Sequence, residues 1–218
     1  MKLFENREEA GRTLGKRLKK FKIEAPIILA MPRGGVPVGF EVAKILKCPL
    51  DVIIARKIGA PNQPELGIGA IAEGNVKIWD REILKIVNEP KNVLDKIVDL
   101  EKREVERRKN LYRNYRPIVD VCDKTVILVD DGVATGITAK ASIYAIKKLN
   151  PKKIIFASPV CSRDSVKDIK HMVDNILCLM TPEEFNSVGQ WYENFDQTTD
   201  EEVKNLLKEN TYSLGVTP

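Results

Sequence analysis

The sequence has few residues that bind metals or act as strong nucleophiles. It contains one histidine, His171, and four cysteines, Cys48, Cys122, Cys161 and Cys178, with no C-x-x-C pair among them. Residues scattered in this way do not form a zinc-binding set. We therefore expect reduced and mostly buried thiols in a cytoplasmic protein.

Long hydrophobic runs are missing as well. No apolar run approaches the roughly 18 residues of a membrane span, and the first residues lack the apolar region of a signal peptide. Repeats and low-complexity linkers are absent, and aromatic residues make up only 6% of the chain. The remaining composition, 43% hydrophobic and 31% charged, is typical of a globular protein with a substantial core. The net charge of +5 would suit an anionic substrate or nucleic acid, but it also serves solubility.

The strongest functional signal lies in residues 126–138, which read VILVDDGVATGIT. Four apolar, mostly β-branched residues predict a buried parallel strand. Asp130 and Asp131 end this strand, a Thr-Gly-Ile-Thr turn follows, and residues 139–149 have helical spacing. Loops of this kind lie at the carboxyl ends of parallel strands, where open α/β sheets bind ligands.

This loop has the groups that a phosphate requires: free backbone N–H groups, a glycine for close approach, two threonine hydroxyls and a helix N-terminus. The two aspartates cannot face that phosphate, because like charges repel. They suit neighbouring hydroxyls such as a ribose diol, with Mg²⁺ close by. A sugar phosphate is therefore the expected ligand. The alternative, an ordinary turn with acids at a helix N-terminus, explains neither the threonine pair nor the buried strand.

A second strand–loop–helix unit lies nearer the N-terminus. Residues 26–31 predict a buried strand, residues 32–35 (Pro-Arg-Gly-Gly) a loop, and residues 36–46 a helix. The glycines would expose N–H groups and Arg33 brings a permanent positive charge. The loop therefore has the properties of an anion-binding site, although a glycine turn with an exposed arginine is the alternative.

The remaining segments predict further strands and helices. Residues 58–69 hold three glycines and two prolines, which predicts a loop or lid. The charged residues 101–109 predict an exposed helix laced by ion pairs, and an RNA-binding face is the alternative there. We expect strands at 50–54, 68–72, 76–79, 153–157 and 175–180, and helices starting after Asn6, at 81–87, 91–112 and 164–172, and after Thr199.

These motifs resemble the type I phosphoribosyltransferases. Residues 126–138 are similar to the loop that binds 5-phosphoribosyl-1-pyrophosphate (PRPP) in that family, and residues 32–35 resemble its pyrophosphate loop. The resemblance implies an α/β fold with a doubly wound, mostly parallel sheet, a small hood and a helical insertion. We expect one domain over residues 1–218, with a core at about 26–180, the insertion at about 81–112 and a C-terminal hood or tail at about 181–218.

The resemblance also implies the roles of individual residues. Asp130 and Asp131 would bind the ribose hydroxyls and, indirectly through PRPP, the Mg²⁺ cofactor. Arg56 and Lys57, at the start of the hood, would close over the pyrophosphate and act with the two aspartates in catalysis. The pyrophosphate loop would supply Arg33, Gly34 and Gly35, with a cis peptide bond expected between Arg33 and Gly34. The PRPP loop would supply Asp130, Asp131, Gly132, Val133, Ala134, Thr135, Gly136, Ile137 and Thr138.

The base-binding site is expected beyond the last strand. Purine transferases place an aromatic ring there, so Phe185, Trp191 and Tyr192 are the candidates, with a hydrophobic plug as the alternative. Ala134 replaces the aspartate that handles the base proton in 6-oxopurine transferases, although adenine transferases also carry alanine. A general acid or base would then come from elsewhere, and Glu73 and Glu65 are the candidates.

The expected function is Mg²⁺-dependent transfer of the phosphoribosyl group from PRPP to a nitrogenous base, such as a nucleobase, with release of pyrophosphate. The insertion and the tail resemble those of uncharacterised prokaryotic phosphoribosyltransferases of unassigned base specificity. A homodimer is expected, and neither a membrane nor a nucleic acid is an expected partner. The alternative is a PRPP-sensing regulator without turnover that could bind RNA through residues 102–109.

Overall fold

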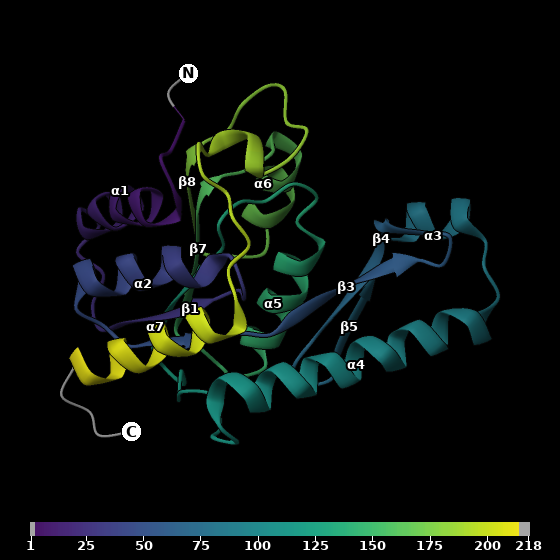
Figure 1. The fold of residues 1–218 in the computed structure, drawn as a ribbon, viewed down its shortest axis with the longest axis horizontal. Coiled ribbons are helices and arrows are strands. Elements are labelled where there is room, and N and C mark those ends of the chain that lie inside the picture. The colour runs from purple at the N-terminus through teal and green to yellow at the C-terminus, as the bar shows by residue number, and fades with distance from the viewer. Residues whose placement is uncertain (1–2, 214–218) are drawn as a thin grey trace.

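The computed structural model describes residues 3–213 (Figure 1). Every helix and strand expected from the sequence is present. In chain order the elements are α1 (Arg7–Lys19), β1 (Pro26–Ala30), α2 (Gly35–Leu46), β2 (Leu50–Val52), β3 (Ala55–Ala60), β4 (Gln63–Ala72), β5 (Val76–Trp79), α3 (Arg81–Val87), α4 (Lys91–Arg113), β6 (Thr125–Val129), α5 (Ile137–Lys147), β7 (Lys153–Val160), α6 (Arg163–Lys170), β8 (Asn175–Met180), the short 3-10 helix η1 (Gly189–Trp191) and α7 (Asp200–Ser213).

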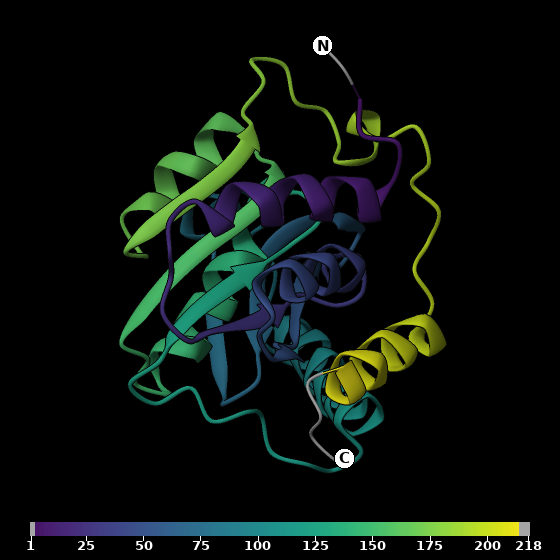
Figure 2. The same ribbon diagram turned by 90° about the vertical axis from the view of Figure 1, so that its left-hand side faces the viewer.

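A five-stranded parallel sheet with the order β2-β1-β6-β7-β8 forms the core. Its central strands β1 and β6 are buried along their whole length and almost entirely apolar, because helices cover both faces. Apolar side chains of α1, α2 and α7 pack on one face, and those of α5 and α6 pack on the other. Figure 2 looks onto the first face, where the purple α1 crosses the strands. The predicted doubly wound α/β fold is confirmed.

The strand order places the two predicted loops next to each other. After β1 the chain continues to β2 on one side, whereas β6 lies on the other side of β1. The loops that follow β1 and β6 therefore leave the same edge of the sheet in opposite directions. Such a reversal of strand order is where open α/β sheets bind their ligands.

A smaller antiparallel sheet, β3-β4-β5, extends from the core with α3 and α4 as an arm (Figure 1). The prediction of a loop at residues 58–69 is wrong, because these residues belong to the β3–β4 hairpin. The pairing shifts register at Gly59, where a Cβ atom would lie only 2.3 Å from the carbonyl oxygen of Pro64. The glycines and prolines thus allow a close approach within an irregular hairpin, rather than an unpaired loop.

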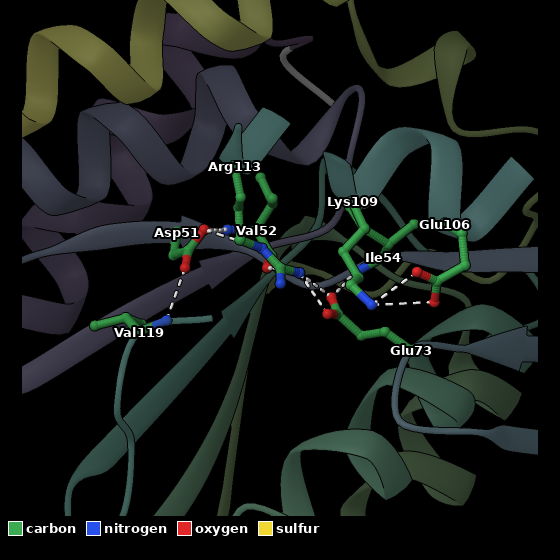
Figure 3. Close-up of polar contacts among 8 residues, drawn as sticks. All are labelled: Asp51, Val52, Ile54, Glu73, Glu106, Lys109, Arg113 and Val119. Carbon is green, nitrogen blue, oxygen red and sulfur yellow. Dashed lines mark hydrogen bonds and ion pairs between the residues drawn. The ribbon is translucent and has the colours of Figure 1, made fainter. Parts of the chain in front are cut away.

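Arg113, at the end of α4, joins the arm to the parallel sheet through buried charges (Figure 3). Its Nη2 donates to both carboxylate oxygens of Glu73, and its Nε lies 3.6 Å from Oδ1 of Asp51. The backbone N–H groups of Ile54 and Val119 donate to Glu73 and Asp51, respectively. Burial raises the pKa of Asp51. We call the contact of Arg113 with Asp51 and Glu73 the joint. Glu73 is therefore bound within the joint and is not open to a substrate.

The charged segment of α4 carries the expected ion pairs. Glu104 accepts hydrogen bonds from Arg107 and Arg108, each with a shortest N–O distance of 2.7 Å. Lys109 donates to Glu106 at 2.8 Å. Such pairs stabilise a helix by ~0.2–0.5 kcal/mol each. Among residues 3–213, no helix combines the length and the apolar composition needed to cross a membrane.

The expectation of four reduced thiols is wrong for two of the cysteines. Cys161 and Cys178 form a disulfide, with their Cα atoms 6.2 Å apart. They are 17 residues apart in sequence, but β7 and β8 are neighbouring parallel strands, which brings them together. Cys48 is a free, buried thiol, and its burial raises its pKa to about 12. Cys122 is free and exposed.

Candidate active site

The loops after β1 and β6 are in direct contact at the edge of the parallel sheet. A Cβ atom on Gly34 would lie 1.9 Å from Oδ2 of Asp131, so only glycine fits beside this carboxylate. A Cβ atom on Gly35 would lie 2.8 Å from the carbonyl oxygen of Val129. The structure thus brings together the two segments that the sequence suggested as anion-binding loops.

The loop after β6 is anchored at its centre and leads directly into α5. Val133 donates to the carbonyl of Val160 at 2.9 Å and accepts from the N–H of Ser162 at 2.8 Å. Gly136 precedes α5 in the left-handed conformation, with φ of +73°. The first N–H groups of a helix have no acceptor within it, so the N-terminus of α5 can bind an anion. Thr135 is exposed at this end of the helix.

Arg7 of α1 neutralises one of the two adjacent carboxylates. Its Nε donates to Oδ2 of Asp131 at 2.8 Å, and both side chains are largely buried. The Arg7 guanidinium also lies 3.8 Å from the centre of the Phe195 ring. Burial, together with the negative charge of Asp131, raises the pKa of Asp130 well above its usual range. The pair therefore combines one carboxylate with a cation partner and one carboxyl that holds its proton more strongly.

Aromatic residues of the C-terminal segment, Tyr192 and Phe195, support the loop after β6. Tyr192 is 5% exposed, and its hydroxyl donates to the backbone carbonyl of Asp131. Its ring centre lies 5.6 Å from that of Phe4 and 5.0 Å from that of Phe195. Tyr192, predicted to contact the base, is thus placed where it holds the loop. Phe185 and Trp191, which pair at 6.3 Å, stay candidates for the base site.

The Tyr192 hydroxyl can be tested alone. Tyr192→Phe should lower the free energy of unfolding by about 1 kcal/mol, because the Asp131 carbonyl loses its donor. The melting temperature, measured by thermal unfolding, should then fall by roughly 2–4 °C. Tyr115→Phe is the matched control, because Tyr115 is 82% exposed. Equal melting temperatures for the two variants would show that this hydrogen bond adds no stability.

The three cations expected at the site lie on different sides of it. Arg56 and Lys57 are adjacent on β3, so their side chains point to opposite faces. Lys57 lies on the α5 side and pairs with the exposed Glu65 at 2.9 Å, whereas Arg56 pairs with Glu101 of α4 at 2.7 Å. Arg33 pairs more loosely with a carboxylate of α7. Only Lys57 of the two hood cations is therefore placed beside the helix that follows the acidic loop.

The cis peptide bond lies one position earlier than expected. It joins Pro32 to Arg33, not Arg33 to Gly34. Gly34 already has ordinary helical backbone angles, with φ of −60° and ψ of −31°, and the carbonyl of Arg33 accepts from Val36. A helical turn thus begins at Arg33, and the bond between Arg33 and Gly34 lies inside this turn.

Arg7 is a functional candidate that the sequence did not reveal, and Tyr192 makes a contact with the acidic loop that the sequence did not predict. Arg7 reaches Asp131 across 124 residues of chain, and Tyr192 reaches it across 61. A weak local signal for Arg7 is its place at the N-terminal end of α1, where the helix dipole disfavours a cation. The aromatic residues of the tail were a signal, but they pointed to a base site rather than to support of the loop.

Comparison with known proteins agrees with this geometry. Residues 3–194 match the phosphoribosyl transferase domain family. The chain is 40% identical over 207 residues to "Putative phosphoribosyl transferase Rv0571c" of Mycobacterium tuberculosis (strain ATCC 25618 / H37Rv) and to a second protein of the same kind from strain CDC 1551 / Oshkosh. The match covers 95% of this chain but 47% of each relative, so the chain spans about half the length of these curated relatives.

A solved structure covers nearly the whole chain. The protein TT1426 from Thermus thermophilus is 35% identical, with a TM-score of 0.79, and the match covers 96% of this chain and 99% of that one. The expected resemblance to transferases of unassigned specificity is confirmed, because the family match extends over both loops, the whole arm and the tail as far as residue 194, and both relatives are named putative phosphoribosyl transferases. The chain belongs to the phosphoribosyl transferase domain family.

Proposed function

We propose that the chain transfers the 5-phosphoribosyl group from PRPP to a nitrogenous base and releases pyrophosphate. The observation that carries this proposal is the contact between Gly34 and Asp131. It joins a glycine-rich loop bearing Arg33 to a loop that combines two adjacent carboxyl groups with a helix N-terminus. A ligand held by both loops would present a phosphate, a sugar diol and a second anionic group, and PRPP has all three.

Each loop has a distinct part in this proposal. The N-terminus of α5, with the Thr135 and Thr138 hydroxyls, binds the 5-phosphate. Asp130 and Asp131 receive the ribose hydroxyls, for which a carboxyl pair offers several acceptor atoms. Because the pKa of Asp130 is raised by burial and by Asp131, the pair can also hold a proton that a hydroxyl oxygen accepts. Arg33 and the N–H group of Gly34 bind the pyrophosphate, since the Gly35 N–H already donates to the carbonyl of Met31 at 3.0 Å.

The residues present fit a metal ion that arrives with the substrate. Within residues 3–213, no group of three or more His, Cys, Asp and Glu side chains could hold a metal ion by itself. Asp130 and Asp131 alone offer too few ligands, but Mg²⁺ commonly uses one or two carboxylates together with substrate phosphates and water. When bound, Mg²⁺ would supply charge neutralisation at the pyrophosphate.

The proposed reaction needs alignment more than covalent chemistry. The bond between C1 and the pyrophosphate oxygen breaks, a ring nitrogen of the acceptor forms a bond at the opposite face of C1, and the proton of that nitrogen passes to water. The two loops fix the sugar and its leaving group, and alignment of this kind can contribute several kcal/mol. Lys57 can exchange its surface pair with Glu65 for the departing pyrophosphate. Phe185 and Trp191 would stack on the acceptor, and Ala134 contributes no proton transfer.

Release of pyrophosphate tests this function directly. The protein is mixed with PRPP, Mg²⁺ and a panel of purine and pyrimidine bases, and pyrophosphate is measured over time. We expect base-dependent release with at least one acceptor and little release without a base. Binding of PRPP without turnover on any base would favour a PRPP-sensing regulator instead. Failure to bind PRPP would contradict both functions.

A further inference from the structure

The first residue of α7, Asp200, is bound by three donors from two other parts of the chain. Nη1 of Arg33 lies 3.6 Å from Oδ1 of Asp200, and Nη2 of Arg107 lies 3.5 Å from Oδ2. The Tyr112 hydroxyl donates to Oδ1 at 2.5 Å. Arg33 comes from the loop after β1, whereas Arg107 and Tyr112 come from α4. One carboxylate therefore lies between two guanidinium groups and a phenol.

This donor set suits a phosphate at least as well as a carboxylate. Arginine forks match phosphate oxygens in geometry and charge, and a phosphate offers more acceptor atoms than a carboxylate. The hydrogen bond from Tyr112, assisted by the nearby arginines, holds the pKa of Asp200 below its usual range. Asp200 is thus an anion at neutral pH and occupies an anion-binding position.

The contacts between Asp200 and the arginines are loose and partly open to solvent. Both N–O distances exceed the ~2.7–2.9 Å of a strong charge-assisted hydrogen bond. By contrast, Arg7 and Arg56 bind their carboxylates at 2.8 and 2.7 Å. The side chains of Arg33, Arg107 and Asp200 retain 26%, 52% and 32% of their exposure. A stronger anion that also accepts the hydrogen bond from Tyr112 could therefore take the place of Asp200.

We propose that Arg107 and Tyr112 join Arg33 in binding a phosphate of the pyrophosphate group, and that Asp200 occupies this site until the substrate arrives. This inference rests on the proposed function, because Arg33 belongs to the proposed pyrophosphate loop. Asp200 is free to leave, since the cap of α7 is made by its neighbours. Thr199 Oγ1 accepts from the N–H of Glu202 at 3.1 Å, without help from Asp200.

Binding of inorganic pyrophosphate in the presence of Mg²⁺, measured by titration calorimetry, tests the proposal. Asp200→Asn removes the competing charge and should tighten binding about fivefold, the scale of one partly exposed ion pair. Arg107→Gln should weaken binding by a similar factor, and Tyr112→Phe should also weaken it. Ribose 5-phosphate lacks pyrophosphate, so Asp200→Asn should leave its affinity unchanged.

The control is Glu201→Gln, which removes the same charge one residue later. Glu201 pairs with Lys204 at 2.8 Å, so this variant should bind pyrophosphate like the wild type. The melting temperature of each variant establishes that it is folded. Equal or weaker pyrophosphate binding by Asp200→Asn would overturn the inference while leaving PRPP binding by the wild type intact. A wild-type protein that binds neither PRPP nor pyrophosphate would instead overturn the proposed function itself.

Discussion

Replacing Arg113 by leucine is expected to lower the free energy of unfolding by about 3–5 kcal/mol, because Asp51 and Glu73 lose the cation buried between them. Arg113 is 4% exposed, so water cannot take over its role. For a domain of this size each kcal/mol lowers the melting temperature by about 2–4 °C. Thermal unfolding should therefore show a decrease of roughly 6–20 °C.

Two further variants identify the cause of this loss. Arg103→Leu removes an exposed cation from the same helix and should change the stability by at most about 0.5 kcal/mol. Adding Glu73→Gln to Arg113→Leu should restore part of the stability, since the glutamine carbonyl can still accept from the Ile54 N–H without a buried charge. If Arg113→Leu unfolds at the same temperature as Arg103→Leu, the joint of Figure 3 does not hold the arm.

Saturating PRPP with Mg²⁺ should raise the melting temperature of the wild type by about 5–11 °C, and Gly34→Ala should remove at least about half of this shift. A ligand at 100 times its Kd stabilises the folded state by ~2.7 kcal/mol, and each kcal/mol is worth roughly 2–4 °C. In Gly34→Ala the new Cβ would lie 1.9 Å from Oδ2 and 2.6 Å from Cγ of Asp131. The carboxylate must move, so both loops lose their arrangement. The PRPP affinity should therefore fall at least about tenfold, which corresponds to a loss of ~1.4 kcal/mol in binding free energy.

Gly74→Ala separates binding from stability in this experiment. Gly74 lies in the β4–β5 turn with φ of +74°, and a Cβ there meets no atom within 4 Å. The alanine is strained by its backbone angle and should lower the melting temperature of the free protein. Its shift with PRPP should nevertheless match the wild type. A full shift in Gly34→Ala would mean that the contact between the two loops is no part of the PRPP site.

The local elements of the fold could be predicted because their signals are contained in short segments. A strand buried on both faces reads as a continuous apolar run, as residues 126–129 do. The cap of α1 needs only Asn6 and Glu9, whose side chain and N–H meet at 2.8 Å. Residues 58–69 were misassigned because glycine and proline mark irregular hairpins as well as loops. The difference depends on what pairs opposite them, which the segment itself does not contain.

The site was predictable only in its two loops. The function proposed for them requires small residues and acids at fixed spacing, so the sequence carries the pattern directly. The partners of these residues depend on tertiary packing instead. Asp200 is an acid in the first turn of a helix, where acids are common without any function, and Arg7 is one of several basic residues of α1. Only the folded chain places one against Asp131 and the other against Arg33.

The first residues of the described chain and the segment after η1 meet at Asp131, and this has a consequence for how the protein is made. The backbone of Phe4 forms an isolated β-bridge with that of Tyr192. Arg7 contacts Asp131, Phe195 and the carbonyl of Asp196. A ribosome releases the N-terminal partners first and the segment around Tyr192 and Phe195 last. The parallel sheet can therefore form on the nascent chain while the acidic loop still lacks its support. The support of the acidic loop is complete only when synthesis has passed residue 196, so a nascent chain can carry the parallel sheet before this loop is held in place.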